Sequence, residues 1–156
     1  MDRLGRSRQR RLGYDVSSVV DRSVRWQMDA SIFSKMKLKP GGSARVFYPP
    51  PSYPMPEEFH WSDDGQAGFV HVFVESRQQF PDRFGRSVAA CAADALLWVS
   101  YRKTVGDINR DSLWTLLLAA NYHPVSQVSL GAEWSAVRAK PNEPGVQYEP
   151  PANVKR

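Results

Sequence analysis

Cysteine is almost absent from this chain of 156 residues, since Cys91 stands alone and no disulfide can form within the chain. A single cysteine fits a reducing compartment. Long apolar runs are also missing. The longest, Ala89 to Val99, is interrupted by Asp94 and is far shorter than the roughly 20 residues that span a membrane. The N-terminus carries charge with no apolar segment behind it, so we expect no secretory signal. The sequence predicts a soluble, intracellular protein.

The patterns that usually mark catalysis are missing too. The three histidines, His60, His71 and His123, lie far apart and have no carboxylate or cysteine at the spacing of metal ligands. The sequence contains no Gly-rich phosphate loop and no nucleophile elbow around a serine. We therefore expect a protein that is not an enzyme, with no catalytic residues, no metal and no cofactor.

Positive charge is concentrated at the start of the chain. Residues 1–45 hold eleven Lys and Arg against four Asp, a charge of +7, whereas residues 46–156 carry −2. Such asymmetry indicates a polyanionic partner, either an anionic membrane or a nucleic acid. The alternative is a solvated tail or a nuclear-import signal. The candidate binding residues are the basic side chains of this arm: Arg3, Arg6, Arg8, Arg10, Arg11, Lys35, Lys37 and Lys39.

A proline-rich segment follows the arm. Five of the eight residues from Pro49 to Pro56 are proline, which favours an extended polyproline II segment. Within it, Pro50, Pro51 and Tyr53 match the PPxY peptide that WW domains bind, since preformed polyproline II loses little entropy on docking. The alternative is a stiff spacer whose Tyr53 packs back on the domain. The residues leave both interpretations open.

The remaining chain predicts a compact domain. Residues 44–48 and 68–75 are typical of strands, the second of them central, because it is apolar on both sides. Residues 87–101 are Ala-rich and favour a helix, and a second helix begins near Asn109 or Asp111 and ends near Asn121. Residues 125–137 alternate as one or two strands, and residues 16–28 fit a short helix or a strand.

These elements predict an α+β fold, a small antiparallel sheet packed against two main helices behind a flexible basic arm. We expect four parts along the chain: a basic arm at 1–45, a linker with the PPxY peptide at 46–58, an α+β core at 59–138 and a Pro-rich tail at 139–156.

The order of these features resembles the matrix proteins of rhabdoviruses, the vesiculovirus type in particular, or a shorter matrix protein of a related negative-strand RNA virus. The segments that carry the resemblance are Pro49 to Tyr53, Phe69 to Val74, Phe80-Pro81, Ser87 through Trp98, and Leu113 to Asn121. The resemblance implies a protein that coats the inner membrane face, condenses the viral ribonucleoprotein and recruits host WW-domain ubiquitin ligases for budding. It assigns the budding function to Pro50, Pro51 and Tyr53, and membrane or nucleocapsid binding to the basic residues between positions 3 and 39.

Two functional hypotheses follow. The first is a viral matrix-like assembly protein that self-associates and is found in the virion, in the host cytoplasm, at the inner face of the host membrane and, if the arm is an import signal, in the nucleus. The second is a small adaptor whose basic arm binds nucleic acid without sequence specificity.

Overall fold

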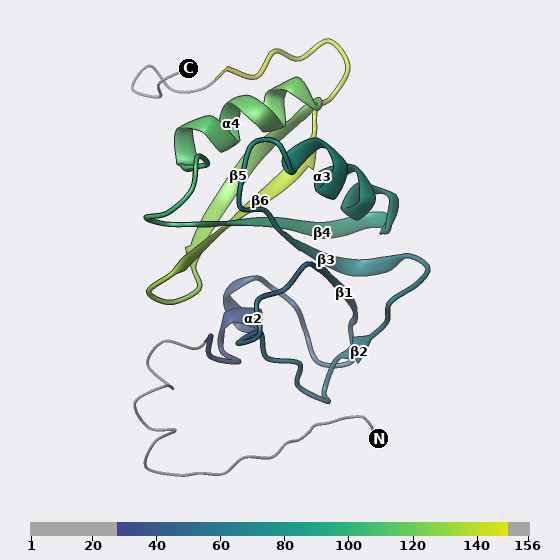
Figure 1. Cartoon of the computed structure of the whole chain (residues 1–156). Helices are drawn as coiled ribbons and strands as arrows, with labels where there is room; N and C mark the ends of the chain where they lie inside the picture. Colours follow the sequence, from purple (N-terminus) through teal and green to yellow (C-terminus); the bar gives the residue numbers. More distant parts are fainter. Residues whose placement is uncertain (1–27, 150–156) are drawn as a thin grey trace.

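One six-stranded sheet organises the part of the chain that the computed structural model describes, residues 28–149. The strands lie in the order β2-β1-β3-β4-β6-β5, as Figure 1 shows. Their bounds are Ser43–Phe47 (β1), His60–Trp61 (β2), Ala67–Phe73 (β3), Cys91–Arg102 (β4), Tyr122–Ser129 (β5) and Trp134–Pro141 (β6). The helices are Ile32–Lys35 (α2), Phe80–Ala89 (α3) and Arg110–Ala119 (α4).

The sheet is mostly parallel, which corrects the expected fold class. Strands β2, β1, β3 and β4 pair in parallel, while β6 pairs antiparallel with both β4 and β5. Strand β5 therefore points the same way as β4, and β6 is the one reversed strand of the described sheet. The expectation of a small antiparallel sheet is wrong. A parallel sheet covered on both faces belongs to the α/β class.

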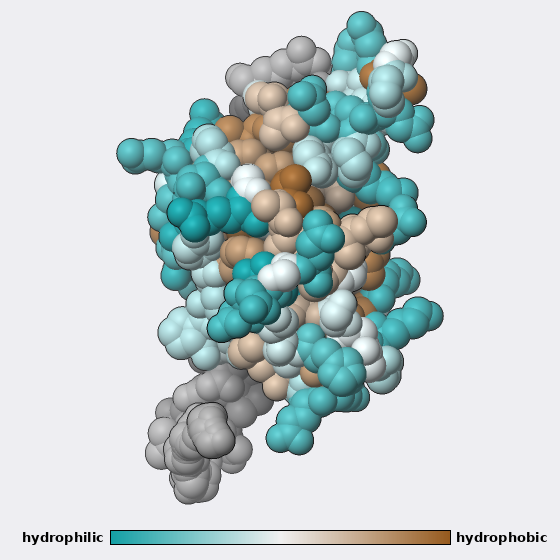
Figure 2. All heavy atoms as spheres, turned by 90° about the vertical axis from the view of Figure 1, so that its right-hand side faces the viewer, coloured by the Kyte–Doolittle hydropathy of each residue, from teal (hydrophilic) through white to brown (hydrophobic). Residues whose placement is uncertain are grey.

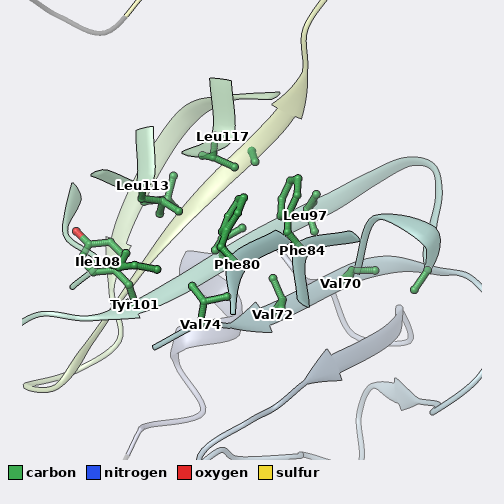
Figure 3. Packing of buried hydrophobic residues seen from close by; sticks show 14 of the residues in the cluster. Val70, Val72, Val74, Phe80, Phe84, Leu97, Tyr101, Ile108, Leu113 and Leu117 are labelled. Atoms are coloured by element: carbon green, nitrogen blue, oxygen red, sulfur yellow. The ribbon is translucent and has the colours of Figure 1, made fainter. Parts of the chain in front are cut away.

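Helices α3 and α4 cover one face of the sheet. Helix α3 packs on β3 and β4 while α4 packs on β5, and the apolar side chains of both helices meet those of the strands in one core, shown in Figure 3. Pro81 and Asp82 stand in the first turn of α3, where a proline costs no hydrogen bond and a carboxylate faces the helix dipole. Asn109 caps α4, since its side chain accepts from the Ser112 amide at 2.8 Å.

The other face is covered by the start of the described chain. Ile32, Phe33 and Met36 are almost completely buried there, and Tyr53 from the Pro-rich segment joins them. The Trp98 indole on β4 donates to the Met36 carbonyl at 3.1 Å, 62 positions away in sequence. Residues that we placed in the arm and the linker therefore form half of the core on this face. They are also the reason that the sheet needs no further helices on this face.

The predicted helix at 87–101 is wrong for most of its length. Helix α3 ends at Ala89, and Cys91–Arg102 is the long central strand β4. A buried strand between two covered faces is apolar on both sides, so its pattern cannot be told from that of a buried helix. Leu97 and Val99 point into the helix-side core, whereas Trp98 points to the opposite face.

Other predictions are confirmed in substance. The strand expected at 68–75 is β3, which lies between β1 and β4 as a central strand should. The helix expected after Asn109 is α4, and the alternating residues at 125–137 lie in the hairpin of β5 and β6. The segment at 16–28 lies almost wholly outside the described residues.

Candidate functional site

The PPxY peptide lies against the sheet. Tyr53 is only 9% exposed, and its hydroxyl lies 3.0 Å from Nδ1 of His71. Pro51 is exposed and Pro50 half-buried. A WW domain needs the tyrosine ring in a pocket of its own, so binding would require this segment to leave the sheet. The observed packing matches the second interpretation given for this segment, a stiff spacer whose Tyr53 packs back on the domain.

The candidate basic residues divide into two groups. Lys35, Lys37 and Lys39 are exposed around α2 and make no ion pair within residues 28–149. Arg3, Arg6, Arg8, Arg10 and Arg11 lie outside the described residues. Over the described range no helix is long and apolar enough to cross a membrane, and no group of three His, Cys, Asp or Glu side chains could hold a metal ion.

Tyr53, His71 and Ser100 form a hydrogen-bonded chain inside the molecule. Nε2 of His71 lies 2.6 Å from the Ser100 hydroxyl, and both residues are completely buried. Burial lowers the pKa of His71 from 6.5 to about 3, so the imidazole stays neutral, and burial raises the pKa of Tyr53 well above its ordinary value. A serine beside a histidine could suggest nucleophilic catalysis, but a substrate cannot reach this one. The chain satisfies buried polar groups and fixes the Pro-rich segment on the sheet.

The carboxyl ends of β1 and β3 form the place where an open α/β sheet usually binds ligands, because the chain connections leave in opposite directions there. In this protein Tyr48, with φ of 60°, follows β1 directly. The Arg83 guanidinium from α3 lies 4.1 Å above the Tyr48 ring and donates to the Phe73 carbonyl at 3.0 Å. Prolines follow Tyr48 where a phosphate site would have a helix N-terminus. Side chains of the protein itself, Tyr48 and Arg83, therefore lie at this place.

A second opening lies where the sheet divides. Pairing between β4 and β6 starts at Leu97 and Ala139, while β6 stays paired with β5 as far as Pro141 and Tyr122. Ala67 on β3 pairs with Cys91 on β4, and Phe69 pairs with Leu96. Two residues along β3 thus correspond to five along β4, so that residues 92–95 form a bulge. Figure 1 shows β5 and β6 turning away from the start of β4. The first part of β4 and the last part of β6 therefore diverge.

A pocket of about 670 Å³ lies in this opening, and we call it the fork pocket. This volume is in the range of sites for small molecules. Figure 2 shows the side of the molecule on which β4 begins, where apolar atoms form a band with polar residues beside it. The lining residues come from α3, β4, β5, β6 and the segment after β6: Val88, Cys91, Ala92, Asp94, Ala95, Leu97, Tyr122, His123, Arg138, Ala139, Lys140, Pro141, Asn142, Glu143, Pro144 and Tyr148.

Arg138 is the residue of the fork pocket that has a buried polar side-chain atom without a partner among the described residues. Its Nε is buried and has no hydrogen-bond acceptor among the described residues. The Arg102 Nε on β4 is similarly buried, but Glu75 lies 3.6 Å from it and the same guanidinium contacts Glu133 at 2.6 Å. Arg138 makes no such ion pair within residues 28–149. Its Nε is thus a buried donor whose hydrogen bond is not made within the described part of the fold.

His123 and Tyr148 form one wall of the fork pocket. Their rings are stacked, with centroids 3.9 Å apart and planes 13° from parallel. Nδ1 of His123 lies 2.8 Å from the Asn142 side-chain oxygen, which can only accept, so Nδ1 carries the proton and Nε2 is left as an acceptor in the neutral ring. The wall is therefore held from two sides.

Cys91 is the one thiol of the chain and also lines the fork pocket. Burial raises its pKa from 9.0 to about 11, so the thiol is protonated at neutral pH and is no nucleophile there. The pKa of Tyr122 is also raised, first by burial and then by Cys91. The pocket can thus donate hydrogen bonds to a ligand more readily than it can attack one.

Sequence reasoning missed the fork pocket. Its polar residues lie on separate strands, and their approach depends on a bulge that no motif announces. One weak signal existed, the carboxylate of Asp94 inside an otherwise apolar run. In the structure Asp94 adopts a φ of 61°, inside the bulge.

No family model matches this chain, and no curated protein matches it. Solved structures do. The ribosomal protein L11 methylase of Lactobacillus delbrueckii subsp. bulgaricus has a TM-score of 0.44 at 8% identity, over 71% of this chain and 75% of that one. A protein in the NADB-Rossmann superfamily from Streptococcus agalactiae has 0.46 at 9%, over 78% and 72%. The structure described as a DhpI-SAH complex has 0.36 at 15%, over 55% and 56%.

These findings correct the functional expectations. The chain is similar to Rossmann-like α/β proteins. Its own sheet is mostly parallel, and the segment from Ser87 to Trp98, which the resemblance to rhabdovirus matrix proteins needed as a helix, lies mostly in β4. That resemblance is therefore wrong, and with it the viral assembly function and the adaptor alternative. The expectation that the protein is not an enzyme is corrected as well: a similar fold occurs in a methylase, so this fold does not exclude catalysis. At these identities the likeness shows the fold alone, and the activity has to be argued from the site.

Proposed function

We propose that this protein binds a small organic acid in the fork pocket, and that Arg138 recognises the acid group. The observation that carries the proposal is the buried, unpartnered Nε of Arg138 beside a pocket of about 670 Å³. A carboxylate is the natural acceptor for a guanidinium, because it receives two parallel N–H bonds. Lys140, two residues further along β6, adds a second positive charge to the pocket.

The energetic cost of Arg138 supports this assignment. A buried donor left without an acceptor costs about 1–3 kcal/mol of stability, and more when the donor is charged. Arg102, on the neighbouring strand, also has a buried Nε without a hydrogen-bond acceptor, but its ion pairs with Glu75 and Glu133 offset that cost. A bound acid would form with Arg138 the kind of ion pair that Glu75 and Glu133 form with Arg102.

A nucleotide-type ligand at the usual place in the sheet does not fit this protein. Tyr48 and Arg83 fill the crevice at the carboxyl ends of β1 and β3, and the segment after β1 is proline-rich where a phosphate site would have a glycine turn and a helix. The SAH of the DhpI structure therefore has no counterpart in the proposal.

Thermal unfolding tests the proposed function. The full chain is heated in the presence of a panel of small monocarboxylic acids, beside the variant Arg138→Met and the control Arg86→Met, which removes an exposed arginine paired with Asp82 on α3. We expect some acids to raise the melting temperature of the native protein and of the control but not of Arg138→Met, because a ligand stabilises only a state that binds it. An acid that stabilises all three proteins equally, or a panel with no effect at millimolar concentration, would overturn the proposal.

A further inference from the structure

Three polar residues of the fork pocket share one face of the hairpin of β5 and β6. Lys140 pairs directly with His123, and Arg138 precedes Lys140 by two residues, which keeps it on the same face. The register confirms the alternation, because the intervening Ala139 belongs to the helix-side core. The guanidinium and the imidazole thus face the same space.

The separation of these groups sets the size of a ligand that contacts both. Residues two apart on one strand are about 7 Å apart at Cα, and a diagonal cross-strand pair is about 7–8 Å apart. A ligand whose acid group meets Arg138 would therefore place its next few carbon atoms beside His123. One ring attached to a carboxylate has about this length.

The wall at that end of the pocket is flat and rigid. The stacked rings of His123 and Tyr148 are held by the Asn142 side chain and by the turn of Glu143 to Val146, which is closed by a hydrogen bond of 3.2 Å. Flat rings favour aromatic neighbours in offset or edge-to-face contact. A wall already fixed in place loses little entropy when a ligand packs against it.

The charge of the pocket limits the acid group. Asp94 and Glu143 line it together with Arg138 and Lys140, so two carboxylates oppose two cations. A singly charged carboxylate gains from the cations with less repulsion than a doubly charged phosphate would meet.

We infer that the ligand is an aromatic carboxylic acid with a single ring, which packs against Tyr148 and His123 while its carboxylate meets Arg138. This inference rests on the proposed function, because it requires the fork pocket to bind an acid.

Two acids of nearly equal size separate the two claims. Benzoate and cyclohexanecarboxylate carry the same charge and the same number of carbon atoms, but only the first ring is flat and aromatic. We expect NMR titration of the full chain to give a dissociation constant for benzoate about two- to tenfold lower than for cyclohexanecarboxylate. Phenyl phosphate should bind more weakly than benzoate.

Variants assign the preference to the wall. Tyr148→Leu should bring the two dissociation constants together while cyclohexanecarboxylate still binds, and Arg138→Met should weaken both acids. The control Tyr48→Leu removes another partly exposed tyrosine, far from the pocket lining, and should leave the ratio unchanged.

Each outcome decides one claim. If both acids bind equally well, or if the preference for benzoate survives in Tyr148→Leu, the aromatic inference is wrong and the proposed function stands. If phenyl phosphate binds best, the assignment of a carboxylate is wrong. If neither acid binds, or if Arg138→Met binds both as the native protein does, the proposed function fails and the inference fails with it.

Discussion

Replacing Arg138 with methionine should remove ligand binding without removing stability. Methionine keeps a long unbranched chain beside Trp98 and Ser126, the two residues that pair with position 138 across the sheet. It deletes the buried Nε–H that has no acceptor. That donor costs about 1–3 kcal/mol in the folded state. We therefore expect the free energy of unfolding to stay level or to rise by up to about that amount.

Urea unfolding at neutral pH measures the difference, with the slope of the transition as a check that the variant unfolds from the same compact state. Arg86→Met is the control, because an exposed pair with Asp82 contributes little. With ligand at 100 times its dissociation constant, the native protein should gain about 2.7 kcal/mol and Arg138→Met nothing. A loss of more than about 2 kcal/mol in Arg138→Met without ligand would refute the reasoning, since it would mean that the guanidinium is already satisfied within the fold.

Four further predictions concern other parts of the molecule. His71 stays neutral in the folded state down to about pH 3, whereas the histidine of the unfolded chain takes up a proton near pH 6.5. The contribution of His71 to the free energy of unfolding should therefore be complete above pH 6.5 and fall by up to about 1.4 kcal/mol per pH unit below it. Urea unfolding midpoints measured between about pH 4 and 7 should show this slope in the native protein and lose it in His71→Asn. Tyr53→Phe leaves Nδ1 of His71 without its partner and should cost about 1–3 kcal/mol in the same assay. Alkylation of Cys91 by iodoacetamide should be slow at pH 8 and rise about tenfold per pH unit toward pH 11, and fast labelling at pH 8 would contradict the buried thiol. Gly106→Ala should destabilise the protein, because its Cβ would lie 2.7 Å from the Glu75 carbonyl at a φ of 91°, whereas Gly85→Ala on α3 meets nothing and should gain up to about 1 kcal/mol.

Local sequence signals predicted the helices and strands whose ends are marked by capping or turn residues. Helix α4 has a capping residue at Asn109 and a proline soon after its end, and the hairpin of β5 and β6 has Gly131 in its turn. Strand β4 has no such markers. Its Ala-rich start favours a helix, and only burial on both faces makes it a strand, which is a property of the sheet rather than of the segment.

The parallel pairing of the strands could not be predicted from the sequence for a related reason. A mostly parallel sheet needs a crossover between consecutive strands, and the connection from β1 to β2 is a proline-rich segment without a helix. Prolines and a tyrosine in such a connection look like an exposed linker. What holds the segment is the chain of hydrogen bonds from Tyr53 through His71 to Ser100, three residues spread over 48 positions of the chain.

The bulge in β4 explains why the candidate site lies where it does. In a sheet of continuous register, β4 and β6 would stay paired to their ends and leave no space between them. The extra residues at 92–95 lead the start of β4 along β3 and away from β6, so that the last residues of β6 have β5 as their neighbour on one side only. Arg138 lies next to the point where this separation begins, and its Nε has no acceptor among the described residues. Tyr48 and Arg83 meanwhile close the crevice at the opposite edge of the strands. Of these two places in the sheet, the one formed by the bulge is therefore the one at which the described structure has a pocket.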